Sequence, residues 1–285
     1  TLVYEEQDDT FYMGVTRTRS DEYLCIGVSS TVSSEMRCTP AAKPGEFTVV
    51  APRQRDFEYS ADHLDGRWVI TTNWDAKNFR IMTLADGQPW GDRTKWQELV
   101  PHSADVLIEG TELFNGYMAI AERSGGLERV RIRMDDGKED FVKADESAYS
   151  MGLSVYAVPG TDGLRYTYAS LTTPASTYEV NVRTNERRLL KEQEVPGGFD
   201  KANYVTERLW ATARDGTHLL DRDYKQGPAM GAHYGADQMM CADIAKFLRG
   251  QSNSLPVSIL DAMTAGIAAM ALDEARHSRS IVDLA

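Results

Sequence analysis

The sequence predicts a mainly β protein: a partial β-propeller of about four blades of four-stranded antiparallel sheet, followed by a short α-helical C-terminal segment. One plan of strands and polar turns occurs four times. The first strands begin near Phe11, Phe57, Val106 and Tyr149, at successive offsets of 46, 49 and 43 residues. The strands are rich in Val, Ile, Tyr, Thr and Trp with period-two alternation. A β-sandwich is the alternative, but it would not predict so even an offset.

Each repeat continues with a central strand and a following strand. The central strands are expected at Glu22–Ser29, Arg67–Thr72, Tyr117–Glu122 and Leu164–Ser170. The following strands are expected at Glu35–Thr39, Asn78–Leu84, Arg129–Met134 and Thr177–Val182. Pairs typical of tight turns punctuate the repeats, namely Asp86-Gly87, Gly125-Gly126, Asp136-Gly137 and Asp162-Gly163. Because four units are few for a wide propeller, we expect exposed blade faces and strand edges.

Composition and charge limit the classes of partner. The chain has 285 residues, 42% apolar and 26% charged, which is typical of one large folded domain or two ordinary ones. Its net charge of -12 argues against binding to nucleic acid or anionic membranes, and leaves cationic peptides or small molecules. No apolar run approaches the roughly 18 residues of a membrane span, and no signal peptide opens the chain. Because it begins at Thr1, already in a strand pattern, we expect a fragment or a trimmed chain.

The three cysteines have no metal-ligand spacing, and their odd number indicates a reducing, cytoplasmic compartment. Cys25 and Cys38 would face each other across a hairpin centred on Thr31-Val32. A disulfide and a pair of reduced thiols are both compatible with this position. We expect two reduced, buried thiols.

No catalytic, cofactor-binding or metal-binding residues are expected. A serine hydrolase needs its nucleophile in a G-x-S-x-G turn, and no such turn occurs; the nearest match is Gly27-Val28-Ser29-Ser30-Thr31, within a strand. None of the histidines follows a plausible nucleophile: His63, His102, His218, His233 and His277. We interpret His63 and His102 as surface or turn residues, and the scattered carboxylates as a solvated face.

The most recognisable stretch is Gln193–Thr217, which follows the last repeat strand at Arg187–Glu192. Pro196-Gly197-Gly198 breaks regular structure, Tyr204–Ala213 returns to a strand pattern, and Asp215-Gly216 predicts a turn. This stretch, together with VYEEQDDTFYMGVTRTRS, PRQRDFEYSADH, TNWDAKNFRI and ERSGGLERVRIR upstream, resembles the oligopeptidase B group of the prolyl oligopeptidase family of serine peptidases. The resemblance covers residues 1–217.

This resemblance implies a propeller that caps an α/β-hydrolase domain and admits only short peptides. The family group cleaves after Lys or Arg, with its acidic specificity residues in the hydrolase domain. We therefore predict a partial propeller at 1–192, a propeller-to-hydrolase crossing segment at 193–217, and an inactive chain without its catalytic domain. The expected partners are short peptides, without nucleic acid or membrane, and exposed blade edges would favour self-association. The alternative is a non-catalytic propeller binding module.

Residues 218–285 predict two helices, near Asp237–Arg249 and from Ser258 to His277, and a short strand at Ser280–Leu284. HYGADQMMCADIAKFLRG, LPVSILDAMTAGIAAMALDEAR and IVDL resemble the C-terminal end of glucose-fructose-oxidoreductase-type NAD(P)-dependent dehydrogenases. The dinucleotide motif G-x-G-x-x-G and the Glu-Lys-Pro motif of that family are absent, so we expect no cofactor. An oxidoreductase fragment is thus a further alternative, and the whole chain is interpreted as a chimera joined near His218–Tyr224.

Overall fold

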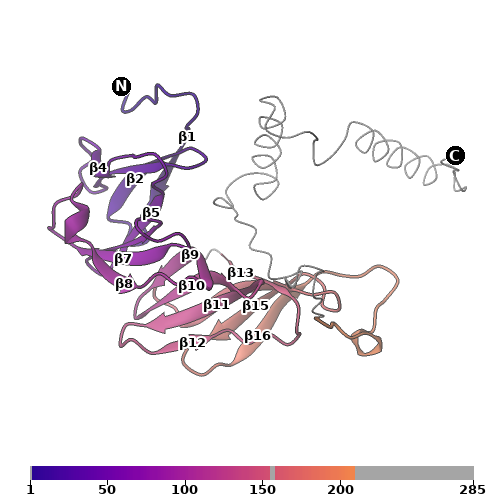
Figure 1. The fold of residues 1–285 in the computed structure, drawn as a ribbon. Helices are drawn as coiled ribbons and strands as arrows, with labels where there is room; N and C mark the ends of the chain where they lie inside the picture. The colour runs from indigo at the N-terminus through magenta and orange to yellow at the C-terminus, as the bar shows by residue number, and fades with distance from the viewer. Residues whose placement is uncertain (1, 155–157, 209–285) are drawn as a thin grey trace, which may run out of the picture. The chain divides into compact units, whose positions relative to one another are not determined.

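The computed structural model describes residues 2–154 and 158–208, all within one compact unit, Thr1–Arg222. These residues form four antiparallel sheets of four strands each, and in every sheet the strands lie side by side in chain order. Figure 1 shows the four meanders following one another along the chain. The prediction of a mainly β, partial propeller of four-stranded blades is confirmed.

The blades are described by their strands, numbered along the chain. The first contains β1 (Tyr12–Arg17), β2 (Tyr23–Ser29), β3 (Ser34–Pro40) and β4 (Thr48–Ala51). The second contains β5 (Tyr59–Leu64), β6 (Arg67–Thr72), β7 (Arg80–Ala85) and β8 (Gln97–Val100). The third contains β9 (Val106–Phe114), β10 (Tyr117–Ser124), β11 (Leu127–Met134) and β12 (Glu139–Phe141). The fourth contains β13 (Ser150–Leu153), β14 (Gly163–Ala169), β15 (Ser176–Asn181) and β16 (Arg187–Glu192).

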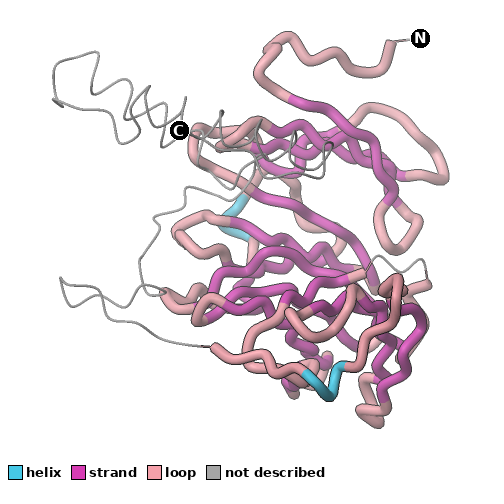
Figure 2. Tube along the Cα trace, turned by 90° about the vertical axis from the view of Figure 1, so that its right-hand side faces the viewer, coloured by secondary structure: helices cyan, strands magenta, loops and turns pink. Residues whose placement is uncertain are grey.

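Helix is confined to two short 3-10 turns among the described residues, η1 (Arg93–Lys95) and η2 (Lys201–Asn203), drawn in cyan in Figure 2. The predicted strand at Tyr204–Ala213 is not present in its described part, Tyr204–Arg208. Among the described residues, no strand pairs with this part, and its backbone therefore forms no sheet hydrogen bonds. The rest of that strand and the predicted helical tail lie outside the described residues.

Apolar side chains form a separate cluster between each pair of successive blades. Val50 of the first blade packs in one cluster with Trp68 and Ile70 of the second. The second and third blades share another cluster, and the third and fourth share a third one. Each blade is therefore held by its neighbours' faces, as in a propeller. In contrast, β1 and β16 are exposed along their whole length.

The hairpin of β2 and β3 places Cys25 directly opposite Cys38, as predicted from its centre. The structure joins the two residues in a disulfide, so the expectation of reduced thiols is wrong. The antiparallel register holds their Cα atoms 4.1 Å apart, and both side chains are fully buried. The cysteine count was a weak guide, because facing positions in a buried hairpin are enough to bring two thiols together.

Removing this disulfide is expected to cost stability. Because it closes a short loop, with a sequence separation of 13, the double variant Cys25→Ala/Cys38→Ala should lose about 3 kcal/mol of unfolding free energy. Urea unfolding of the oxidised wild type and of the variant measures the loss. The reduced wild type is the control and should resemble the variant. A wild-type curve that reducing agent leaves unchanged would contradict the prediction.

Candidate functional site

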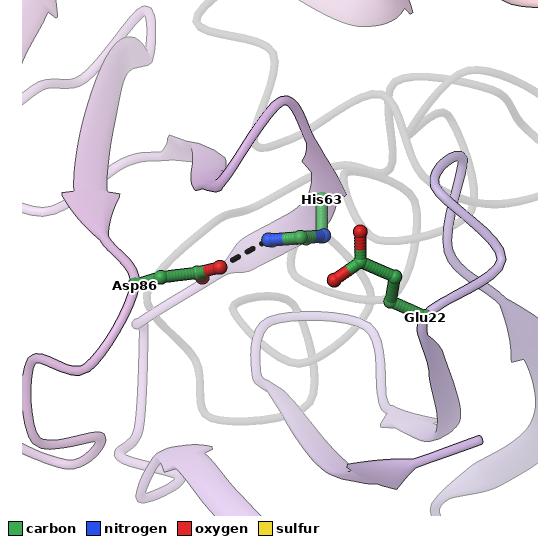
Figure 3. Close-up of side chains that lie close together, drawn as sticks. All are labelled: Glu22, His63 and Asp86. Atoms are coloured by element: carbon green, nitrogen blue, oxygen red, sulfur yellow. Dashed lines mark hydrogen bonds and ion pairs between the residues drawn. The ribbon is translucent and has the colours of Figure 1, made fainter. Parts of the chain in front are cut away.

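A buried histidine lies at the contact between the first two blades. His63 is on β5 and has no exposed surface. Its Nε2 lies 3.0 Å from Oδ1 of Asp86, which follows β7, and its Nδ1 lies 2.8 Å from Oγ of Ser20 in the β1–β2 turn. Glu22 of the same turn reaches the ring from the other side (Figure 3). Elements from two blades thus converge on one imidazole.

The imidazole is also fixed by the rings around it. The ring of Tyr23 lies 4.9 Å from that of His63 in an edge-to-face arrangement, and the ring of Trp68 lies at 5.2 Å. Burial, and then the charges of Asp86 and Glu22, raise the pKa of the Tyr23 phenol above its ordinary value. The ring of Tyr23, which packs against His63, therefore lies in the negative potential of these two carboxylates.

Ser20, His63 and Asp86 have the residue types of a catalytic triad, but their geometry does not support nucleophilic catalysis. In a hydrolase triad the nucleophile contacts Nε2 and the carboxylate contacts Nδ1, whereas here the two partners are exchanged. Ser20 Oγ also accepts the backbone N–H of Glu22 at 3.1 Å. Because the imidazole is fully buried, a peptide carbonyl cannot approach both groups. The string of hydrogen bonds joins the two blades.

The interpretation of His63 as a surface or turn residue is wrong. Tyr59, Ala61 and His63 alternate along β5 and are all buried, so the period-two pattern could have placed His63 on the inner face. His102 is exposed in a loop after β8, as predicted. His218, His233 and His277 lie outside the described residues. The prediction that the chain has no catalytic residue stays untested.

A second polar contact joins the β1–β2 turn of the first blade to the first strands of the next two blades. Arg19 of the first blade donates from its backbone N–H to Asp62 on β5 at 2.8 Å and from Nε to the carbonyl of Leu113 on β9 at 3.0 Å. Its guanidinium lies 3.7 Å from Glu112. Burial raises the pKa of both carboxyls, Asp62 and Glu112, against the lowering effect of the Arg19 charge. These contacts hold the first blade against the second and third blades.

The third blade holds an ion-pair network around a buried carboxylate. The carboxylate of Glu122 has no exposed surface and lies 2.6 Å from Nε of Arg129 and 2.8 Å from Nη2 of Arg131. Arg131 also reaches Glu139 at 3.2 Å. Both arginines border a cavity of about 180 Å³ that His102 lines from the second blade. Each formal charge has a partner, which makes the network a structural feature of β10 and β11.

The segment after β16 folds back onto the fourth blade. Lys201 of η2 lies 2.6 Å from Glu146, which precedes β13. Thr206 is held through Thr172 at 2.9 Å and through Ser147 at 3.0 Å. Burial alone would raise the pKa of Glu146, but hydrogen bonds from Lys201, Thr173 and Tyr168 hold it at about 2. A charged anchor thus fixes this segment to the propeller.

This anchor predicts an acid-sensitive contribution to stability. Since the folded-state pKa of Glu146 lies below its ordinary value of 4.5, the ionised group stabilises the folded chain above that pH, and the contribution is lost as the pH falls toward about 2. Glu146→Gln should therefore lose about 2 kcal/mol at neutral pH and show a flatter pH dependence. Urea unfolding across this range measures it, with Glu194→Gln, an exposed residue, as control. Equal acid dependence in Glu146→Gln and wild type would contradict the assignment.

The described residues thus define a β-propeller domain in which polar clusters lie both within blades and between them. Within them no helix is long and apolar enough to cross a bilayer.

Comparisons with known proteins assign the family. The sequence model described as the prolyl oligopeptidase N-terminal beta-propeller domain matches residues 1–193. The chain is 60% identical over 216 residues to dipeptidyl aminopeptidase BI of Pseudoxanthomonas mexicana, covering 75% of this chain and 30% of that protein. Protease 2 of Moraxella lacunata is 27% identical, covering 82% of this chain and 34% of that protein.

Solved structures agree with this assignment. Oligopeptidase B from Leishmania major has a TM-score of 0.68 at 30% identity, and covers 76% of this chain and 32% of its own. The closed form of oligopeptidase B from Trypanosoma brucei, with covalently bound antipain, has a TM-score of 0.67 at 28% identity and the same coverages. The chain therefore belongs to the prolyl oligopeptidase family, and it spans about a third of the length of these relatives.

Proposed function

We propose that this chain is the substrate-admitting propeller part of a serine-type peptidase that acts on short peptides. The observation that supports this most is the succession of four blades across the matched residues 1–193, at 60% identity to a dipeptidyl aminopeptidase. Propellers of this kind bring rigid first strands to one axis. The bond chemistry would belong to a hydrolase part, because Ser20 contacts Nδ1 of a fully buried imidazole, an arrangement that does not support nucleophilic catalysis.

We propose that 1–192 are the partial propeller and 193–217 the crossing segment. The contact of Lys201 with Glu146 supports a fixed start of the crossing segment, since it ties the chain after β16 to the fourth blade. The dehydrogenase-like tail at 218–285 stays a prediction, and so does the chimera. The Lys or Arg preference is likewise a proposal; the net charge of -12 is compatible with cationic peptides.

An engineered chimeric enzyme tests whether the propeller admits short peptides and excludes folded proteins. The matched region of the Pseudoxanthomonas enzyme is replaced by the corresponding residues of this chain, and hydrolysis of short fluorogenic peptides and of a folded protein is compared. We expect cleavage of the short peptides only. A folded chimera that degrades the folded protein at a similar rate would refute the admitting role.

A second experiment tests the chain by itself for peptidase activity. Incubation with peptide substrates and with a serine-directed fluorophosphonate should give no hydrolysis and no labelled band. Labelling of this chain, abolished by replacing one serine, would show a nucleophile and would overturn the assignment of the chemistry to another part. Substrates with and without Lys or Arg at the cleaved bond, offered to the active chimera, test the preference.

A further inference from the structure

We propose that Glu22, His63 and Asp86 bind a divalent transition-metal ion of the zinc class, which joins the first two blades. The three residues offer one imidazole nitrogen and two carboxylate oxygens, and these ligand atoms lie within 4.8 Å of one another. Zinc binds nitrogen and oxygen ligands at about 2.0 to 2.2 Å, so the ligand atoms around one tetrahedral ion lie roughly 3.3 Å apart. The exposed Glu22 carboxylate lies on the other side of the ring from Asp86 (Figure 3), and its side chain would rotate toward Nε2 to complete the ligand set.

The imidazole is already oriented for a metal ion at Nε2. Nε2 faces Asp86 at 3.0 Å, while Nδ1 lies 2.8 Å from Ser20 Oγ. With a metal ion at Nε2, Nδ1 keeps its proton and donates a hydrogen bond to Ser20 Oγ, and the Ser20 hydroxyl then donates to Thr18 Oγ1 at 3.1 Å. A ligating histidine normally has such a partner on its other nitrogen, which fixes the ring and its tautomer. The hydrogen bonds to Asp86 and Ser20 hold the buried ring in this orientation.

The charges of the site also favour a cation. Within the part of the chain that the structure describes, neither Glu22 nor Asp86 has a Lys or Arg partner, whereas the buried Glu122 is paired with two arginines. Both carboxylates are exposed, so an ion can enter from solvent, and a water molecule can take the fourth position. A histidine in the ligand set favours zinc-class ions over calcium or magnesium, which prefer oxygen ligands alone.

The position of the site indicates its role. Glu22 comes from the β1–β2 turn of the first blade, and His63 and Asp86 come from the second (Figure 3). One ion would therefore connect two blades that apolar packing and hydrogen bonds, such as those of Ser20 and Arg19, already join. Because an ion that binds only the folded state stabilises it, the site would act as a metal staple between blades.

Titration of the full chain with zinc chloride tests the proposal by calorimetry, and cobalt chloride gives the absorption of four-coordinate Co²⁺. Glu22→Gln and Asp86→Asn remove one ligand each at exposed positions, so they leave the buried ring in place. Asp21→Asn is the matched control, since Asp21 is an exposed neighbour outside the ligand set and Asn tolerates its φ of 63°. Binding to other histidines or to Cys241 is common to all variants and cancels in the comparison.

We expect wild type and Asp21→Asn to bind one more equivalent of zinc than Glu22→Gln and Asp86→Asn, or to bind it at least about tenfold more tightly. Zinc should also raise the melting temperature of wild type and of Asp21→Asn, and raise it less in the two ligand variants. Equal binding isotherms for all four proteins, or no binding to wild type, would overturn the proposal.

Discussion

Replacing Glu122 with alanine is expected to lower the free energy of unfolding by about 3 to 5 kcal/mol. The variant removes the shared partner of Arg129 and Arg131, whose side chains are only 33% and 15% exposed. A half-buried guanidinium without its carboxylate loses its main compensation for desolvation. Equilibrium unfolding in urea, followed by circular dichroism, measures the difference.

Glu98→Ala is the matched control for this prediction. Glu98 also pairs with an arginine across neighbouring strands, at 3.4 Å from Arg80, but its side chain is 47% exposed. Its loss should cost less than about 1 kcal/mol, because an exposed ion pair contributes little. If both variants lost the same free energy, burial would not be the cause of the Glu122 effect.

The repeat of the fold was readable because each blade carries its own local signals. Alternating strands and glycine turns predicted β6 at its observed bounds and β10 and β11 to within two residues. Two further hairpin turns carry the same kind of signal. Asp65-Gly66, with φ of 52° and 71°, joins β5 to β6, and Asn115-Gly116 joins β9 to β10.

The cluster of Glu22, His63 and Asp86 could not be predicted from the spacing of these residues in the sequence. Glu22, His63 and Asp86 are 41 and 23 residues apart, in two turns and a strand of two blades. Known metal motifs are read from short spacings on one element, and none applies here. What brings these residues together is blade packing, which strand patterns do not specify. The burial of His63 was nevertheless readable from the alternation of Tyr59, Ala61 and His63 on β5.

The disulfide separates what the sequence predicted correctly, the pairing of two residues, from what it predicted wrongly, their oxidation state. The hairpin centre predicted the facing of Cys25 and Cys38, because register in an antiparallel pair is local. The oxidation state was inferred from the number of cysteines in the whole chain, which carries no information on one buried pair. Local geometry was therefore predictable here, and the chemical state was not.

Trp68→Ala is expected to cost about 3 to 5 kcal/mol and to loosen the first two blades together. The indole is 1% exposed and packs in the apolar cluster shared by these blades. Its ring lies 4.9 Å from that of Tyr23 in the first blade and 5.3 Å from that of Trp90. Urea unfolding followed by circular dichroism gives the loss, and hydrogen exchange should quicken in β2 as well as in β5 and β6.

Two variants make the Trp68 prediction specific. Trp68→Phe should recover part of the loss, since it restores a ring and leaves a smaller cavity. Tyr12→Ala removes an aromatic side chain that is 82% exposed on β1, and should change the free energy by less than about 0.5 kcal/mol. If Trp68→Ala quickened exchange in β5 and β6 alone, the first blade would be held by contacts other than this cluster, such as the hydrogen bond between Ser20 and His63.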